Sequence, residues 1–366
     1  MRYIYQQAGW PKFTWNHGVI DAPLAAVRHR QGRLLGRMES LGFPQRDEAM
    51  LQTLTQDVLK SGEIEGERLS AEQVRSSVAR RLGMDIAGLV PADRGVDGVV
   101  EMTLEATQNY AKPLTAERLF AWHALLFTGA ASGAGKLNIG AWRDDAKGPM
   151  QVVSGGIGRE RVHFEAPPAG NIPDEMEQFL DWVNLTGGVD PVLRAAIAHF
   201  WFVTIHPFED GNGRIARAIA DWALAGAENT SLRFYSMSAQ IRRERNAYYD
   251  LLETTQKGGL DITEWLLWFL GCLDRAIAGT ELSLAGVFRK EQFWKTYAGV
   301  AFNDRQRLML NKLLDGFNGK LTSTKWAALA KCSQDTAQRD IQQLIDNGIM
   351  VKSTGGGRST SYALKL

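Results

Sequence analysis

The most informative segment of this chain reads His206-Pro207-Phe208-Glu209-Asp210-Gly211-Asn212-Gly213-Arg214-Ile215-Ala216-Arg217. Before it, apolar residues recur at helical spacing from Pro191 to about Ile205 and predict a helix. Pro207 disfavours helical dihedral angles at the residue before it, so this helix should end at His206. A second helix is predicted to start near Arg214. The segment is therefore expected to connect two helices in a mainly α-helical fold.

The backbone and the cations of this segment suit the binding of phosphate groups. Gly211 and Gly213 can adopt positive φ at little steric cost, so the backbone amides can turn toward an anion. Arg214 and Arg217 lie three residues apart, on one face of the predicted helix. Cations at a helix N-terminus oppose the helix dipole. Two arginines there indicate that an anion lies between them and the amides.

Two further side chains add chemistry to this segment. His206 can accept a proton near neutral pH, which suits a general base. Asp210 offers a hard carboxylate oxygen, which Mg²⁺ accepts together with phosphate oxygens. Arg217 can donate two hydrogen bonds to a terminal phosphate. The alternative, a capped turn with a buried histidine, explains only the glycines.

The chain resembles the Fic (filamentation induced by cAMP) family at these residues. The family signature, His-Pro-Phe-x-Asp/Glu-Gly-Asn-Gly-Arg-x-x-Arg, is matched at every fixed position. The resemblance implies a helical Fic core that transfers AMP from ATP to a Ser, Thr or Tyr hydroxyl of a target protein. It implies His206 as the base and Asp210 as the Mg²⁺ ligand. The residues implied to bind the nucleotide are Gly211, Asn212, Gly213, Arg214, Arg217 and, on the adenine side, Asn246.

Upstream of this segment, a row of apolar residues at helical spacing is continued by a serine and then a glutamate. Leu51, Leu54 and Val58 follow helical spacing, and the same spacing continues to Ser61 and Glu65. A buried glutamate needs a cation beside it, because an isolated buried charge is strongly unfavourable. An exposed helix end among glycines is the alternative interpretation of this segment.

The same residues resemble the inhibitory Ser/Thr-x-x-x-Glu-Gly/Asn motif of Fic proteins, through Ser61, Glu65 and Gly66. Their position before the core resembles the class whose inhibitory helix is N-terminal. The resemblance implies that Glu65 pairs with Arg217 and that this contact inhibits the enzyme.

Residues 149–153 and 161–164 are joined by the glycine-rich connection 154–158, which predicts a β-hairpin. Fic proteins carry such a flap, and the resemblance implies that its Val152 and Val153 hold the target segment by strand pairing. An ordinary surface hairpin is the alternative.

The chain is predicted to have three parts: an N-terminal module with the inhibitory helix (1–100), the Fic core (101–290) and a winged helix (303–366). The last part contains ten Lys and Arg against five Asp and Glu. Binding of DNA and contact with another protein, including a homodimer, are both open for it. The residues that would face DNA are Gln334, Thr336, Gln338, Arg339, Lys352 and Arg358.

Composition sets the frame for these predictions. With 366 residues and 45% hydrophobic content, the chain has enough apolar material for two or three domains. Its net charge of +1 gives no general attraction to nucleic acid or membranes. Cys272 and Cys332 look like buried thiols, and no signal peptide or membrane span is evident. A cytoplasmic location is expected.

The function expected from the sequence is AMP transfer from Mg-ATP to a protein hydroxyl, which can belong to this chain itself. Removal of AMP at the same site, with Glu65 orienting a water molecule, is the alternative reaction. A nucleotide-sensing transcriptional regulator is the alternative from another class. The sequence names neither the target nor the oligomeric state.

Overall fold

The computed structural model describes residues 3–85, 88–128, 137–155, 159, 161–185, 187–314, 317, 319–353 and 360–365, the side chain of Pro44 excepted. Fifteen α-helices and two small antiparallel sheets form the described part, so the prediction of a mainly α-helical fold is confirmed. The chain divides into two compact units, Met1–Thr280 and Glu281–Leu366. Residues 1–100 thus share one unit with the predicted core.

The first unit contains eleven α-helices, two short 3-10 helices (η1 and η2) and one hairpin among its described residues. Its N-terminal elements are η1 (Ile4–Gln6), α1 (His17–Glu39), α2 (Phe43–Ile64), α3 (Ala71–Arg81), α4 (Arg94–Gln108) and α5 (Ala116–Leu126). The elements that follow are β1 (Gln151–Ser154), β2 (Arg161–Glu165), η2 (Ala169–Asn171), α6 (Ile172–Asn184), α7 (Pro191–Ile205), α8 (Asn212–Glu228), α9 (Met237–Arg243), α10 (Arg245–Gln256) and α11 (Thr263–Ser283).

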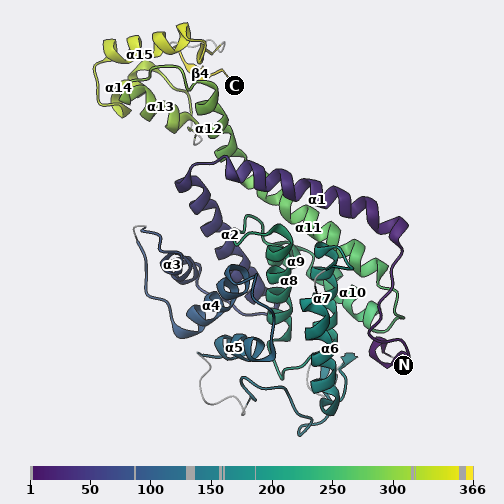
Figure 1. Cartoon of the computed structure of the whole chain (residues 1–366). Helices are drawn as coiled ribbons and strands as arrows, with labels where there is room; N and C mark the ends of the chain where they lie inside the picture. The colour runs from purple at the N-terminus through teal and green to yellow at the C-terminus, as the bar shows by residue number, and fades with distance from the viewer. Residues whose placement is uncertain are drawn as a thin grey trace. The chain divides into compact units, whose positions relative to one another are not determined.

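Helices α7 and α8 form the centre of this unit and lie side by side (Figure 1). The bounds of α7 agree with the prediction. Its first turn is stabilised by Asp190, whose side chain accepts a hydrogen bond from the Val192 amide, and by Pro191 at the first helical position. Nearly every residue of α7 is buried, as expected for a helix that is apolar on all sides. The connection between α7 and α8 is therefore anchored on both sides by buried helices.

Helix α2 brings a distant part of the sequence to this connection. Leu51, Leu54 and Val58 are all buried, as their spacing predicts. The helix packs against α3 and α9 and also contacts α8. It ends at Ile64, so that Glu65 follows directly after its last turn.

The predicted hairpin is present as strands β1 and β2. Their register pairs Val152 with Phe164 and Ser154 with Arg161, with an irregularity between Val152 and Val153. Most of the glycine-rich connection, residues 156–158, lies outside the described residues.

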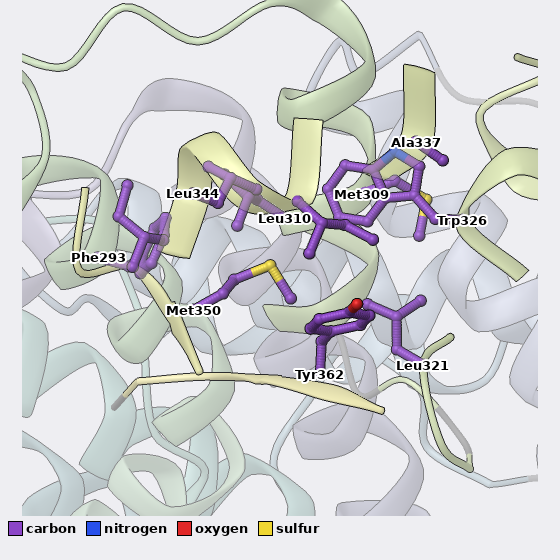
Figure 2. Packing of buried hydrophobic residues seen from close by; sticks show 11 residues of the cluster. Phe293, Met309, Leu310, Leu321, Trp326, Ala337, Leu344, Met350 and Tyr362 are labelled. Carbon is purple, nitrogen blue, oxygen red and sulfur yellow. The ribbon is translucent and has the colours of Figure 1, made fainter. Parts of the chain in front are cut away.

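The second unit contains α12 (Ala285–Thr296), α13 (Asp304–Leu314), α14 (Ser323–Leu329), α15 (Gln334–Asp346), β3 (Met350–Lys352) and β4 (Tyr362–Leu364). Figure 2 shows its buried core, in which Trp326 lies near Met309 and Leu310 of α13. Phe293 of α12 belongs to the same core, although the sequence-based division placed this residue between the core and the last domain.

The order of helices and strands in this unit is the order expected of a winged helix. Ser333 caps α15, because its side chain accepts a hydrogen bond from the Thr336 amide. Strands β3 and β4 pair antiparallel, with Lys352 opposite Tyr362. The winged-helix assignment stays a prediction, and Arg358 lies outside the described residues.

Candidate active site

His206 is held at the end of α7 in a left-handed conformation, with φ 53° and ψ 57°. The predicted end of the helix at this residue is confirmed. Its imidazole Nδ1 lies 3.2 Å from the Val203 carbonyl oxygen, so a proton on Nδ1 can be donated there. Burial lowers the pKa of His206 to about 4. The imidazole is therefore neutral at physiological pH, with Nε2 able to accept a proton.

Arg143, which the sequence analysis did not single out, fixes the backbone of this loop. Its guanidinium donates hydrogen bonds to the carbonyl oxygens of His206 (2.8 Å) and Pro167 (2.5 Å). Its backbone amide donates to the Pro207 carbonyl oxygen at 2.9 Å. The side chain is fully buried and pairs with Asp145 at 3.0 Å. No sequence signal near Arg143 indicates this role, since its partners lie far along the chain.

His123 supports the other end of the loop. Its Nδ1 accepts a hydrogen bond from the Gly140 amide at 3.0 Å, so the proton resides on Nε2. Nε2 lies 3.2 Å from the Asp210 carbonyl oxygen and donates to it. The ring also stacks on Phe208, with 4.2 Å between the ring centroids. Phe208 is fully buried, as an anchor for the loop requires.

Asn212 closes the loop on itself. Its side-chain amide accepts a hydrogen bond from the Phe208 amide and donates one to the Phe208 carbonyl oxygen, at 3.0 and 2.7 Å. Gly211 has the positive φ predicted for it, 81°. Helix α8 begins at Asn212, so the positive φ predicted at Gly213 is wrong: this residue is already helical. The side chain of Asn212 therefore holds the loop closed through two hydrogen bonds to Phe208.

Arg217 is paired with the end of α2. Its guanidinium lies 2.9 Å from the Glu65 carboxylate and donates to the Ser61 hydroxyl at 2.9 Å and carbonyl oxygen at 3.0 Å. Burial alone would raise the pKa of Glu65, but Arg217 and Arg214 outweigh it and hold this pKa below its usual value. The structure thus brings together Ser61, Glu65 and Arg217, as the resemblance implied.

Two glycines allow the backbone and the side chain of Glu65 to take their positions. Gly66 has φ 87°, a left-handed conformation that lets the chain turn directly after Glu65. A Cβ atom on Gly213 would collide with the Glu65 carboxylate. The absence of a side chain at Gly213 therefore leaves the space that Glu65 occupies.

Arg214 is paired in the same way with Glu67, which the sequence analysis did not identify. The two side chains form an ion pair, although Glu67 is 41% exposed and Arg214 only 5%. Asp210 also lies 3.7 Å from Arg214. Both arginines predicted to bind phosphate thus contact carboxylates from one short segment, 65–67. The only signal for Glu67 in the sequence is an acidic residue two positions after Glu65.

A cavity of about 480 Å³ joins these elements. Glu65, His206 and Gly213 line it, together with Val152 and Val153 of the hairpin. Helix α10 contributes Arg245, Tyr248, Tyr249, Asp250, Leu252, Glu253 and Gln256. Asn246 is exposed and is not among the lining residues; of the predicted nucleotide ligands, Gly213 lines this cavity.

Asp210 fits the role of a magnesium ligand. Its side chain is 60% exposed, and one carboxylate oxygen accepts a hydrogen bond from the Gly211 amide at 2.6 Å. Among the described residues, no group of three His, Cys, Asp or Glu side chains could hold a metal ion. An ion at Asp210 would therefore take its other ligands from phosphates and water, which is the usual way Mg²⁺ is held.

Comparison with known proteins agrees with this geometry. Residues 113–224 match the Fic/DOC family, and residues 3–84 match a domain of unknown function, DUF4172. The chain therefore contains a Fic domain, within which the signature segment lies. The fold also resembles a Fic family protein from Desulfovibrio desulfuricans G20, with a TM-score of 0.57 at 22% identity over 97% of this chain and 98% of the other.

Two curated relatives carry the name protein adenylyltransferase Fic. The protein from Drosophila willistoni is 30% identical over 36% of this chain. The protein from Culex quinquefasciatus is 26% identical over 61% of this chain. The chain covers 26% and 40% of the length of these two relatives.

Proposed function

We propose that this protein transfers AMP from ATP to a hydroxyl group of a protein. The observation that carries the proposal is the neutral imidazole of His206, which lines a cavity beside the start of α8 and its two buried arginines. A neutral imidazole can accept a proton, and the helix start with Arg214 and Arg217 can hold phosphate groups. The names of the relatives support the same reaction.

In the proposed reaction, the target hydroxyl loses its proton to Nε2 of His206 as its oxygen attacks the α-phosphorus. The bond from this phosphorus to the bridging oxygen breaks, and pyrophosphate leaves. Arg214, Arg217 and the amides at the start of α8 stabilise the charge on the leaving group. Asp210 would hold Mg²⁺, which neutralises phosphate charge. Arg143 and His123 keep the loop in position.

We also propose that the protein is autoinhibited. Glu65 forms an ion pair with the Arg217 guanidinium, which would otherwise bind the terminal phosphate of ATP. Glu67, which lies in the same segment as Glu65, forms an ion pair with Arg214. The two contacts together remove both cations from the phosphate site, and the space left by Gly213 is filled by Glu65.

The hairpin is proposed to hold the target. Val152 and Val153 line the cavity with His206, and Val153 is 49% exposed. A target segment that pairs with this strand would bring its hydroxyl toward the imidazole.

The experiment is labelling with ATP that carries a radioactive α-phosphate, on the purified chain alone and with cell extract. Glu65→Gly should raise the label on protein at least tenfold, because it frees Arg217 for the phosphate. Glu67→Gln in the same background should raise it further. Arg217→Ala should cancel the gain, since both changes act through one contact.

Glu63→Gly is the matched control, because Glu63 lies in the last turn of α2, two residues before Glu65, and pairs with Lys60 and Arg242 rather than with Arg214 or Arg217. An equal rise in this control would refute autoinhibition by Glu65. No label on any protein with any variant would refute AMP transfer. Release of AMP from a pre-labelled protein would instead identify the removal reaction.

A further inference from the structure

A hydroxyl, an imidazole and a carboxylate are aligned on the wall of the cavity. The Ser154 hydroxyl oxygen lies 2.5 Å from Nε2 of His163. Nδ1 of His163 lies 2.5 Å from the Glu253 carboxylate. The three residues come from β1, β2 and α10, and all of them line the same cavity as His206.

The hairpin register explains this alignment. Ser154 is opposite Arg161, and His163 is the extra residue of β2 at the register irregularity, between Val162, which pairs with Val153, and Phe164, which pairs with Val152. Diagonal neighbours across an antiparallel pair are close enough for side-chain contact. Both Arg161 and His163 contact Glu253 of α10, so the pairing of the strands and the position of α10 together set the geometry.

The charges favour one assignment of the protons. Hydrogen bonds from Lys257, His163 and Arg161 outweigh burial and lower the pKa of Glu253 to about 2. The ionised carboxylate accepts the proton on Nδ1 of His163, which leaves Nε2 free to accept the proton of Ser154. This is the order of groups that activates a serine hydroxyl in hydrolases.

The other hydroxyls that line the cavity have different partners. The Tyr248 hydroxyl is within 2.9 Å of His199 and is buried, which raises its pKa. The Tyr249 hydroxyl donates to Glu65 at 3.4 Å. Ser154 differs from both tyrosines in that its hydroxyl is exposed and its imidazole partner is itself bound to a carboxylate, Glu253.

We propose that Ser154 is an acceptor of AMP within this chain, with His163 as the group that receives its proton. The proposal rests on the proposed function and names a substrate for it. The Ser154 oxygen forms a bond to the α-phosphorus of ATP, and the bond to the bridging oxygen breaks. The proton moves to Nε2 of His163, and pyrophosphate leaves with the electron pair of the broken bond.

The experiment uses the full chain with Glu65→Gly, incubated with Mg-ATP and then digested for peptide mass spectrometry. AMP is expected on the peptide that contains Ser154. Ser154→Ala should remove this signal, whereas Ser154→Thr should retain part of it. Ser40→Ala is the control, because Ser40 is an exposed hydroxyl that donates to the Arg37 backbone carbonyl oxygen of α1 rather than to an imidazole.

The role of His163 is tested in the same background. His163→Ala should reduce the rate of Ser154 modification about 100-fold, the lower range for loss of a general base. Imidazole added to the solution should restore part of the rate, which a purely structural role of His163 would not allow. Failure of rescue with a folded variant would assign the proton to another group and overturn this part of the proposal.

The outcomes separate the two proposals. AMP on other residues or on other proteins, with Ser154 unmodified, would overturn the Ser154 proposal and leave AMP transfer in place. AMP on no protein at all would overturn both. Melting temperatures of the variants show whether each of them is folded.

Discussion

At the scale of single residues, the site depends on charged groups whose environment changes their chemistry. Burial keeps the imidazole of His206 neutral, so it can act as a base over a wide range of pH. Arg214 and Arg217 are buried, and each of them forms an ion pair with a carboxylate. The proposed reaction and its inhibition therefore use the same two cations.

The pH dependence of transfer tests the role of His206. The protonated imidazole cannot accept a proton, so activity should fall on the acid side only as pH approaches about 4, because burial lowers the pKa of His206 to that value. In the Glu65→Gly variant, kcat/KM should therefore stay level as pH falls through 6.5, the ordinary histidine pKa. A fall centred near 6.5 would contradict the buried, neutral base.

His206→Ala should abolish transfer to target proteins while ATP still binds, because the phosphates are held by the helix start and the arginines. Modification of Ser154, whose proton is proposed to move to His163, is measured separately. Binding is measured by calorimetry and transfer by label. Transfer at the parent rate would show that His206 is not the base.

At the scale of elements, the connection between α7 and α8 is held by groups from outside it. Arg143 binds the carbonyl oxygens of His206 and Pro167, and His123 binds that of Asp210. Asn212 bridges the backbone of Phe208 from within. These contacts hold His206 and Asp210 at fixed positions, which a loop of this length would not do alone.

Arg143→Ala should lower both stability and transfer. It leaves buried carbonyl oxygens without a donor, at about 1–3 kcal/mol for each unsatisfied group. Arg118→Ala is a matched control, because Arg118 also donates to several carbonyl oxygens but supports the end of α4. Thermal unfolding should report a loss in both variants, and transfer by the folded protein should fall only with Arg143→Ala. Equal effects on transfer would show that Arg143 acts through general stability.

At the scale of the whole molecule, two compact units make up the chain, and each has its own core. Trp326, Leu310 and Tyr362 are buried in the core of the second unit (Figure 2). Their packing holds its helices against its small sheet. Among the described residues, no helix is long and apolar enough to cross a membrane.

The second unit gives a prediction on DNA. If α15 and the hairpin of β3 and β4 bind duplex DNA, Arg339→Glu and Lys352→Glu should weaken the retardation of DNA in a gel. Each should also lower the salt slope by about 1 for each phosphate contact that is lost. Lys12→Glu changes the net charge equally but lies in the first unit, so it should have little effect. Binding of no duplex by the parent chain would favour the protein-contact interpretation.

Much of this site was predictable from sequence because its main residues are local. A proline next to His206, a glycine at 211 and arginines three positions apart are enough to predict the end of one helix, a turn and a phosphate-binding helix start. The apolar stripe of α2 likewise predicted which face of that helix is buried. The contact between Glu65 and Arg217 was predicted only through the resemblance, since no local pattern joins residues so far apart.

Tertiary structure alone decided the remaining contacts. Arg143, His123 and Glu67 act through partners far along the chain, and the register of the hairpin brings Ser154 and His163 to Glu253. Local propensity controls where helices start and end, because it depends on neighbouring residues. Ion pairs and buried hydrogen bonds depend instead on which surfaces pack together, so they become visible only in the folded chain.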